Sequence, residues 1–197
     1  MNKLRMALLC GALALVTAAA DAQTNVRVRG TITAFDGRVL SVKSRDGKDL
    51  KLQLADNATV AAAKAITLAD LKSGDYVGVT ALPNTEGKLV VREVHTIART
   101  VPEGHGPWET EPGATMTNAN IAKTVKAISG HDLTLEYKGG SQTILVPEGV
   151  PIVTTVPADR TLLAPGTYVF IAAQAAADGT LTALRIQASK DGVKPPQ

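Results

Sequence analysis

The stretch Leu68-Ala-Asp-Leu-Lys-Ser-Gly-Asp-Tyr-Val-Gly-Val79 organises the chain, because a second version of it returns about 92 residues later. In this first version Thr67 is placed to cap a short helix, and Asp70 is placed to reach back to the cap amide. Gly74 can take the left-handed conformation that ends a helix. The β-branched and aromatic residues after it favour a strand, so the stretch predicts a helix of one or two turns followed by a strand.

The second version reads Thr161-Leu-Leu-Ala-Pro-Gly-Thr-Tyr-Val-Phe-Ile171. Asp159 is its candidate cap, and Pro165 stands where helical hydrogen bonding must stop, so a 3₁₀ turn serves equally well there. Four glycines of the first half recur in the second at shifts of 93, 93, 92 and 92 residues. The pairs are Gly37 and Gly130, Gly47 and Gly140, Gly74 and Gly166, and Gly87 and Gly179. This self-similarity predicts one module written twice.

Alternating apolar and polar residues within the module predict strands. Residues Asn25 to Phe35 place Val26, Val28 and Ile32 on one side and the arginines on the other, as in a half-buried antiparallel strand. Further strands are expected at 39–43, 50–54, 76–81 and 89–97, with hairpin turns at Asp36-Gly37 and Asp46-Gly47. Three strands, a helix and two strands are the order of an OB-type barrel. The fold class expected is therefore all-β, with two tandem OB-like five-stranded barrels and one short helix per repeat.

The first 22 residues have the pattern of an export signal. Lys3 and Arg5 precede an apolar run, and Ala20-Asp-Ala22 is a small-x-small cleavage site, so we expect cleavage after Ala22 and a periplasmic protein. The apolar run is shorter than the roughly 20 residues that span a bilayer, so no stable membrane insertion is expected. Cys10, the only cysteine, lies in this segment, so the remaining 175 of 197 residues contain no thiol for a disulfide, a metal or catalysis.

Composition shifts predict the domain boundaries. Prolines and glycines interrupt the pattern between the two repeats, and two prolines stand near the end of the chain. The division expected is a signal peptide at 1–22, barrel repeat 1 at 23–98, a Pro/Gly-rich linker at 99–118, barrel repeat 2 at 119–188 and a disordered tail at 189–197. If each repeat is a separate domain, a fragment ending near Arg99 should unfold cooperatively on its own.

The pattern of a G-x-I strand, a D-G hairpin, the segment L-x-D-L-K-x-G-D-x-V-x-V and a final strand resembles the exported bacterial module called domain of unknown function 5666, in two copies over residues 26 to 188. The linker segment Glu103-Gly-His-Gly-Pro-Trp108 is similar to a subgroup whose members sometimes carry a metal ABC transporter permease label. A chain without a membrane span conflicts with that label. The resemblance implies no catalytic residues.

The most unusual residues lie in the linker. A ligand site is expected at His105, Trp108, Glu109 and Met116, because unusual loop residues more often serve function than residues in strands. In the alternative interpretation His105, Met116 and His95 hold a metal ion, with copper favoured by His and Met, and zinc or nickel by His and carboxylate. A purely structural interpretation remains open, in which Trp108 packs the linker onto the barrels and His105 faces solvent.

Several function classes are excluded by what the sequence lacks. Three scattered histidines form no nucleophile–base pattern, so no enzyme and no resident cofactor are expected. A net charge of only +3 and two aromatic residues in the first module, Phe35 and Tyr76, argue against nucleic acid. The expected function is a binding or scaffold module for an envelope protein or a carbohydrate-type ligand. The alternative is a periplasmic carrier of a metal ion or small molecule. The oligomeric state is left open.

Overall fold

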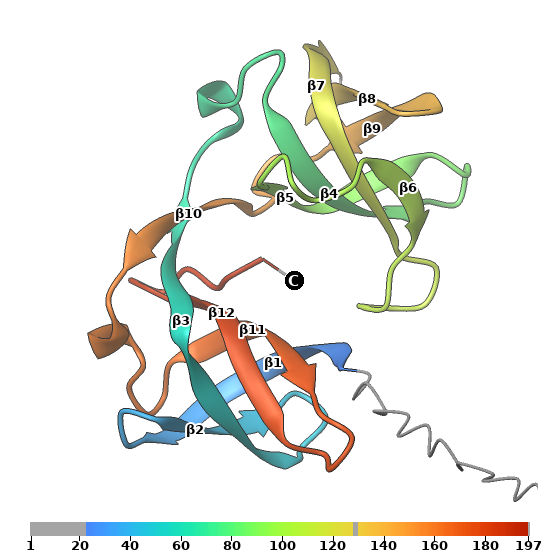
Figure 1. The fold of residues 1–197 in the computed structure, drawn as a ribbon. Coiled ribbons are helices and arrows are strands. Elements are labelled where there is room, and N and C mark those ends of the chain that lie inside the picture. Colours follow the sequence, from blue (N-terminus) through green and yellow to red (C-terminus); the bar gives the residue numbers. More distant parts are fainter. Residues whose placement is uncertain (1–22, 128–129, 197) are drawn as a thin grey trace, which may run out of the picture.

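The computed structural model describes residues 23–127 and 130–196, and the expected signal segment with its cleavage site at Ala22 lies outside this range. The chain is almost entirely β-structure, as expected (Figure 1). The strands are β1 (Thr24–Phe35), β2 (Val39–Ser44), β3 (Asp49–Ala65), β4 (Tyr76–Pro83), β5 (Leu89–Thr96), β6 (Gly104–Pro107), β7 (Thr115–Ala127), β8 (Gly130–Tyr137), β9 (Gly140–Val146), β10 (Ile152–Ala158), β11 (Tyr168–Ala175) and β12 (Leu181–Ala188). Two 3₁₀ turns, η1 (Leu68–Asp70) and η2 (Arg160–Leu162), precede β4 and β11.

The first barrel, in the lower half of Figure 1, consists of β1, β2, β3, β11 and β12. The order β12-β11-β1-β2-β3 is antiparallel throughout, and a parallel pairing of β12 with β3 closes the ring. Its core is aliphatic and includes Ile32, Leu40, Leu52, Ile171 and Ile186, all at most 1% exposed. The alternation predicted for the first strand is confirmed, because Val28 and Ile32 face this core.

The second barrel, in the upper half of Figure 1, consists of β4, β5, β7, β8 and β9. Here the order is β5-β4-β7-β8-β9, and a parallel contact of β5 with β9 at Val90 and Leu145 brings the two ends together. The core includes Val77, Val79, Leu133, Leu135 and Ile144, none of them measurably exposed. Both barrels thus have the five-stranded architecture of OB folds, the first closed by the pairing of β12 with β3 and the second joined at its ends by a single pair.

The two barrels exchange strands, which corrects the predicted division into tandem domains at 23–98 and 119–188. Strands β4 and β5 of the first repeat pair with β7, β8 and β9 of the second, through β4 and β7 in particular. Strands β11 and β12 of the second repeat return to β1 and β3 of the first. Each barrel therefore takes three strands from one repeat and two from the other, and each hydrophobic core contains residues of both repeats.

An approximate two-fold axis relates the two halves. It passes through the antiparallel ladder of β3 and β10, where Val60 pairs with Ala158 and Ala65 pairs with Val153. Val60 and Val153 are equivalent residues of the two repeats, 93 residues apart, and so are Ala65 and Ala158. A two-fold rotation that swaps the repeats therefore places each of these pairs on the other. The bulges follow the same relation, with one between Ile32 and Ala34 in β1 and one between Ile121 and Lys123 in β7.

The length of β3 explains the exchange. It runs for 17 residues, which at roughly 3.3 Å per residue far exceeds the height of one small barrel. Its residues as far as Ala62 pair with β2 and β12 of the first barrel. From Val60 onward it also pairs with β10, and its end carries the chain to the other barrel. In the second repeat Pro147 and Pro151 break the equivalent stretch into β9 and β10, and β10 leads the chain back to the first barrel. The predicted third strand ended at Leu54, and the continuation was missed.

The local signals of the repeated stretch are confirmed. The Thr67 amide donates to Asp70 Oδ2 at 2.8 Å, and Gly74 has a φ of +89°. This hydrogen bond and a second one from the Thr67 hydroxyl lower the pKa of the Asp70 carboxyl. In the second copy the Thr161 amide donates to Asp159 Oδ1 at 2.9 Å. The short helices take the 3₁₀ form in both copies.

Two segments expected to be irregular are ordered. The predicted linker 99–118 contains β6 and the start of β7, and β6 pairs with β7 along four residues. The predicted disordered tail forms a turn in which Lys190 bridges Val193, and its Pro195 and Pro196 are buried. Figure 1 places this end of the chain between the two barrels. Proline loses little conformational freedom on ordering, so such a tail can pack at low entropic cost.

The turn between β2 and β3 gives a pH prediction. Lys48, at 2.8 Å, and the Ser44 hydroxyl stabilise the ionised Asp46 carboxylate and lower its pKa from 3.8 to about 2. Such a group contributes stability above the unfolded pKa, and this contribution is lost as the pH falls toward the folded pKa. Asp46→Asn should therefore lose less stability than the parent protein between pH 5 and pH 2, measured by urea unfolding. Asp56→Asn is the charge-matched control; equal losses in parent and Asp46→Asn would contradict the prediction.

Candidate ligand-binding cleft

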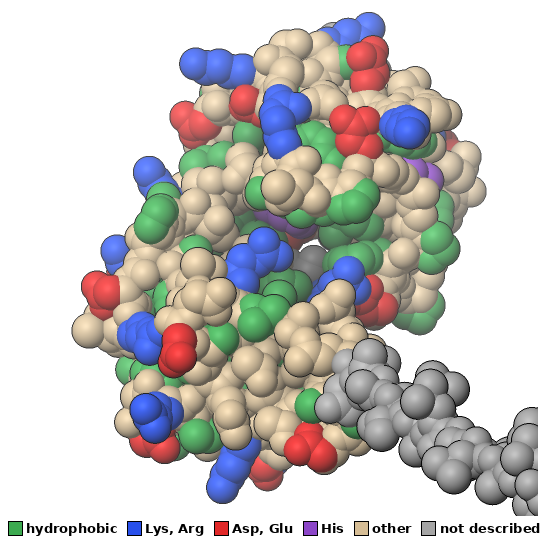
Figure 2. Space-filling view, in the orientation of Figure 1, with side chains coloured by type: hydrophobic (Ala, Val, Ile, Leu, Met, Phe, Trp, Pro, Cys, Tyr) green, Lys and Arg blue, Asp and Glu red, His purple; other side chains and the backbone are tan. Residues whose placement is uncertain are grey.

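A cleft of about 280 Å³ lies between the two barrels. Strands of both barrels line it, together with β10, the residues after β5 and Pro196 of the tail. Figure 2 shows the molecule hollowed between its halves, with Lys and Arg side chains beside the hollow. The polar and aromatic residues that line the cleft include Arg27, His95, Trp108, Asn118, Phe170, Arg185 and Gln187.

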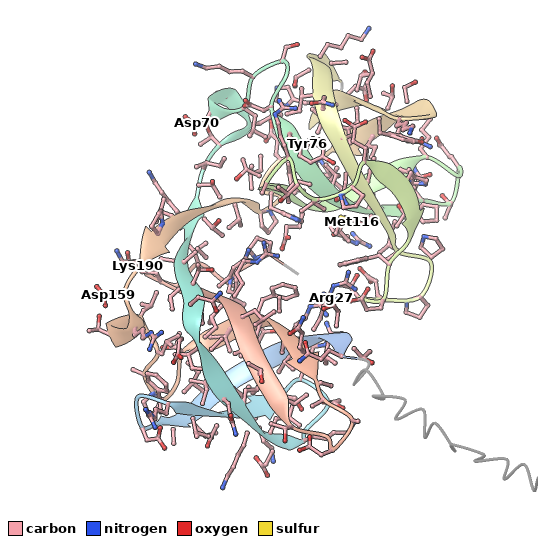
Figure 3. All side chains as sticks on the ribbon, viewed as in Figure 1. Arg27, Asp70, Tyr76, Met116, Asp159 and Lys190 are labelled. Carbon is pink, nitrogen blue, oxygen red and sulfur yellow. The ribbon has the colours of Figure 1, made fainter. Side chains whose placement is uncertain are left out.

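Arg27 and Met116 occupy equivalent places on the two sides of this cleft. Arg27 lies on β1 and Met116 on β7, and each faces the space between the barrels (Figure 3). The equivalence follows from the strand pairing. Tyr168 and Tyr76 are equivalent residues of the two repeats, and they pair with Thr31 and Asn120. Arg27 and Met116 each lie four residues before these partners. The approximate two-fold axis therefore brings the N-terminal halves of β1 and β7 to opposite walls of one cleft.

The loop between β6 and β7 docks against the first barrel through aromatic and charged contacts. Trp108 lies on this loop, and the Arg27 guanidinium lies 4.9 Å from the centre of its ring. Arg29 lies between two rings, 5.9 Å from that of Trp108 and 4.9 Å from that of Phe170. Stacking on aromatic faces is a preferred arrangement for the planar guanidinium. The contact joins the second barrel to the first on the side away from β3 and β10.

Glu109 completes this contact. Its Oε1 lies 3.2 Å from Arg29 Nη2 and 3.7 Å from Arg27 Nη1. The Arg29 side chain is only 7% exposed, so a carboxylate beside it offsets the cost of burying its charge. Arg29 Nε and Trp108 Nε1 are buried donors without a hydrogen-bond partner. The site thus holds two unused donors next to two rings.

The lining of the cleft is positively charged, although Glu109 lies outside it at 3.7 Å from Arg27. Two arginines, Arg27 and Arg185, line it, and none of the described residues that line it is acidic. Cations that line a cleft with low-dielectric walls raise the local concentration of anions. The guanidinium fork binds a carboxylate, sulfate or phosphate through two parallel hydrogen bonds. The cleft is therefore suited to a small anion-bearing ligand with a flat apolar face.

His95 lies on β5 at the second-barrel side of the cleft and is 8% exposed. Its Nδ1 lies 3.1 Å from Glu93 Oε1, close enough for an ion pair although the geometry does not satisfy a hydrogen bond. On the other side of the ring, Nε2 contacts Gly78, where a Cβ would lie 2.5 Å from it. The imidazole is therefore fixed between a carboxylate and a glycine backbone.

The structure brings together only part of the predicted site. Trp108, Met116 and His95 line the cleft, whereas Glu109 is engaged by the two arginines. His105 lies apart, because it pairs with Thr117, whose side chain is buried in the second barrel. Its Nδ1 lies 2.8 Å from Thr117 Oγ1. The three residues of the metal interpretation, His105, Met116 and His95, thus do not share one face.

A metal site finds no further support in the geometry. Across residues 23–127 and 130–196, no group of three or more His, Cys, Asp and Glu side chains is close enough to hold a metal ion. His105 instead stacks on Tyr137, with ring centroids 6.2 Å apart. The purely structural interpretation agrees with the geometry in both parts, because Trp108 packs the loop onto the first barrel and the His105 side chain is exposed.

Sequence reasoning missed Arg27, Arg29, Phe170 and Arg185. The two β1 arginines had the appearance of the solvated face of a half-buried strand, and the other two lie in a repeat expected to form a separate barrel. Arg27 and Arg29 occupy alternate positions of β1, and Phe170 of β11 pairs with Arg29, so the three side chains share one face of the sheet. Recognising them as a site required knowledge of the strand exchange.

The strands and the cleft define an all-β protein of two interlocked OB-like barrels. Its second half matches the family model of a domain of unknown function, DUF5666, once, over residues 124–187. That segment begins in the last residues of β7 and runs nearly to the end of β12, so it contains strands of both barrels. No curated protein and no solved structure matches the chain. Among the described residues, no helix is long and apolar enough to cross a membrane.

Proposed function

We propose that the protein is a non-enzymatic binding module that holds an acidic carbohydrate-type ligand in the cleft between its barrels. The observation that carries this proposal is the combination of Trp108 and Phe170 with Arg27 and Arg185 in one cleft that has no acidic lining residue among those described. Aromatic faces pack against the C–H face of a sugar ring, and guanidinium groups bind its carboxylate.

The size of the cleft restricts the ligand. Small-molecule sites have volumes of about 300 Å³ upward, and this cleft of about 280 Å³ is at the lower limit. A single sugar ring is the unit of matching size, so we propose a uronic acid residue, free or at the end of a chain. Trp108, which lines the cleft, has an Nε1 donor without a hydrogen-bond partner that a ligand oxygen could satisfy.

We further infer that the module is a duplication and that the protein is exported. The equivalent bulges of β1 and β7, and the exchange of Val60 and Val153 across the axis, support a second, diverged copy of the DUF5666 module in the first half. The basic and apolar leader with Ala22 supports periplasmic localisation. For the permease label of the resembling subgroup, we propose no transport step; a neighbouring envelope protein is the partner that we expect.

Ligand binding should be measured by titration calorimetry with glucuronate, with glucose as the neutral control. We expect glucuronate to bind and glucose not to bind. Trp108→Ala and Arg185→Gln should each weaken glucuronate binding by about tenfold or more, since each removes one of the two kinds of contact. His105→Ala, which changes the other face of β6, should bind like the parent protein. Equal heats for glucuronate and glucose would overturn the proposal.

His105→Ala, together with Met116→Ala, also tests the metal-carrier alternative. Native mass spectrometry with added copper, nickel or zinc would show an additional mass that a chelator removes if the protein carries a metal. Loss of this mass in His105→Ala and Met116→Ala, together with absence of glucuronate binding, would replace the carbohydrate proposal by the carrier. Retained glucuronate binding in His105→Ala, whose side chain lies outside the cleft, with no metal uptake by the parent protein, is the result that our proposal predicts.

A further inference from the structure

The second barrel carries a sixth strand that the first barrel lacks. β6 (Gly104–Pro107) pairs antiparallel with Asn118–Thr115 of β7, on the edge that β8 leaves open. By the two-fold relation, residues 115–118 of β7 correspond to Val26–Arg29 of β1. Those residues pair with β11 on one edge, but β2 begins its pairing only at Gly30, so no strand of the described residues pairs with Val26–Arg29 on the other edge.

The open edge has backbone groups available for pairing. The Ile32 amide donates to Thr167 toward the β11 side, and N–H and C=O groups of alternate residues point to opposite edges. Those of Arg27 and Arg29 therefore point to the open edge. The Arg29 carbonyl accepts there from the Arg45 amide at 2.7 Å. An extended segment could accept a hydrogen bond from the Arg27 amide and donate one to the Arg27 carbonyl. It could also donate to the Arg29 carbonyl in place of the Arg45 amide.

The second barrel shows how the displaced amide would be satisfied. Lys138, at the position that corresponds to Arg45, donates its amide to Glu103 Oε2 at 2.7 Å. Glu103 directly precedes β6, so an acidic residue before the added strand takes the amide that the strand displaces. An incoming segment with an acidic residue at that place would do the same for the Arg45 amide.

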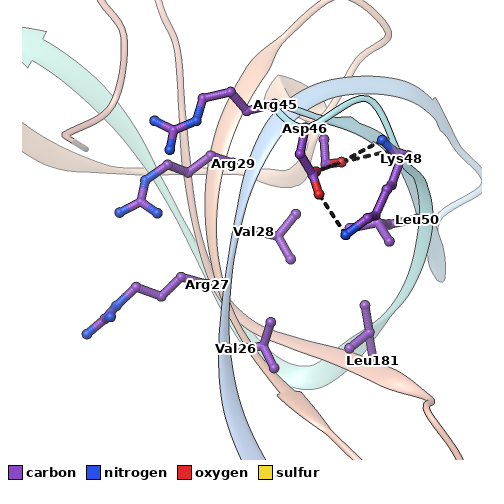
Figure 4. A pocket seen from close by; sticks show the side chains of 10 residues that line it. Val26, Arg27, Val28, Arg29, Arg45, Asp46, Lys48, Leu50 and Leu181 are labelled. Carbon is purple, nitrogen blue, oxygen red and sulfur yellow. Dashed lines mark hydrogen bonds and ion pairs between the residues drawn. The ribbon is translucent and has the colours of Figure 1, made fainter. Parts of the chain in front are cut away.

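A pocket of about 360 Å³ lies beside the open edge (Figure 4). Its apolar side is formed by Val26, Val28, Leu50 and Leu181. In the second barrel His105 covers the corresponding place, where it contacts Thr117 and stacks on Tyr137 while its outer side stays exposed. Thr117 corresponds to Val28, and Tyr137 to the much smaller Ser44. The first barrel thus has a hollow where the second has a strand residue and a tyrosine.

We propose that the edge Val26–Arg29 binds an extended acidic segment of a partner protein, added antiparallel to β1 as β6 is added to β7. The charge around the pocket identifies the partner as acidic. The lining residues include Arg27, Arg29, Arg45 and Lys48 against Asp46 alone, and Glu109, which pairs with Arg27 and Arg29 from outside the lining, still leaves an excess of two positive charges. Asp46 is already paired with Lys48 at 2.8 Å. Strand addition of this kind takes affinity from the main chain and specificity from alternate side chains.

The geometry specifies a probe, the fluorescein-labelled peptide Glu-Gly-Val-Glu-Val. Its first residue faces the Arg45 amide, the glycine lies beside the buried Arg29, the first valine enters the pocket, the second glutamate lies opposite Arg27 and the last valine lies beside Val26. Fluorescence anisotropy with the protein should show saturable binding that weakens as salt is added. The peptide Lys-Gly-Val-Lys-Val is the charge-reversed control and should not bind.

Backbone methylation separates strand addition from simple charge attraction. N-methylation of the second glutamate removes the amide that pairs with Arg27 and should weaken binding about tenfold or more. N-methylation of the first valine, whose amide points away from β1, should change it less than about threefold. Arg27→Pro should abolish binding, and Arg27→Ala should only weaken it, because proline removes the outward N–H while an edge strand tolerates it.

Three results would overturn the proposal. Equal binding of the two methylated peptides would reduce the interaction to charge alone. Absence of binding at millimolar peptide would leave the edge without this partner. A concentration-dependent dimer of the protein that disappears in Arg27→Pro would assign the edge to a second copy of the chain. Because no probe here contains a sugar, these results do not depend on glucuronate binding in the cleft.

Discussion

A fragment from Gln23 to Arg99, which contains the first repeat alone, is expected to show no cooperative unfolding as a monomer. This is the opposite of what two tandem barrels predict. The first barrel takes two of its five strands, β11 and β12, from the second repeat, and they contribute Val169, Ile171 and Ile186 to its core. The fragment loses them, and its own β4 and β5 lose the three strands on which they pack.

The measurement is thermal unfolding by circular dichroism and calorimetry at several concentrations. The intact protein should unfold cooperatively, and the fragment should give a broad, low-amplitude transition. Mixing it with the complementary fragment that begins at Thr100 should restore the transition, because together they supply both sets of five strands. A monomeric fragment that unfolds sharply, with the transition independent of concentration, would mean that the repeat can close on itself.

Most individual elements could be predicted from the sequence, and their pairing could not. Alternation and turn residues are local signals, so the strands at 39–44, 76–83 and 89–96, the capping box at Thr67 and the positive φ of Gly74 were all predictable. The choice of the later strand that pairs with β1 does not depend on local sequence. The two copies of the module are similar enough that β4 and β11 are alternative partners for β1, and the length of β3 decides between them.

The candidate site was predictable only where its residues lie in an unusual segment. Trp108 stood out because it is the only tryptophan of the chain, and it does lie in the cleft. Its partners Arg27 and Arg29 belong to a regular alternating strand, and nothing in the sequence distinguishes them from a solvated face. The cleft exists because β3 and β10 hold two barrels side by side, so its other wall comes from distant residues.

The strand exchange makes a prediction at a single buried residue. Ile171 is in the second repeat, but its side chain is in the core of the first barrel and is not measurably exposed. Ile171→Ala should lower the free energy of unfolding by about 2–5 kcal/mol, as do other large-to-small core substitutions. The matched variant is Val79→Ala, at the corresponding position of the first repeat but in the core of the second barrel.

Methyl chemical shifts show which core each substitution disturbs, even when the whole molecule unfolds as one unit. Ile171→Ala should shift the methyl signals of Leu40, Val42 and Leu52, which belong to the other repeat, and leave those of Leu133 and Ile144 in place. Val79→Ala should do the reverse, with a smaller loss of stability since fewer carbons are removed. If Ile171→Ala shifted Leu133 and Ile144 instead, each repeat would have its own core and the strands would not be exchanged.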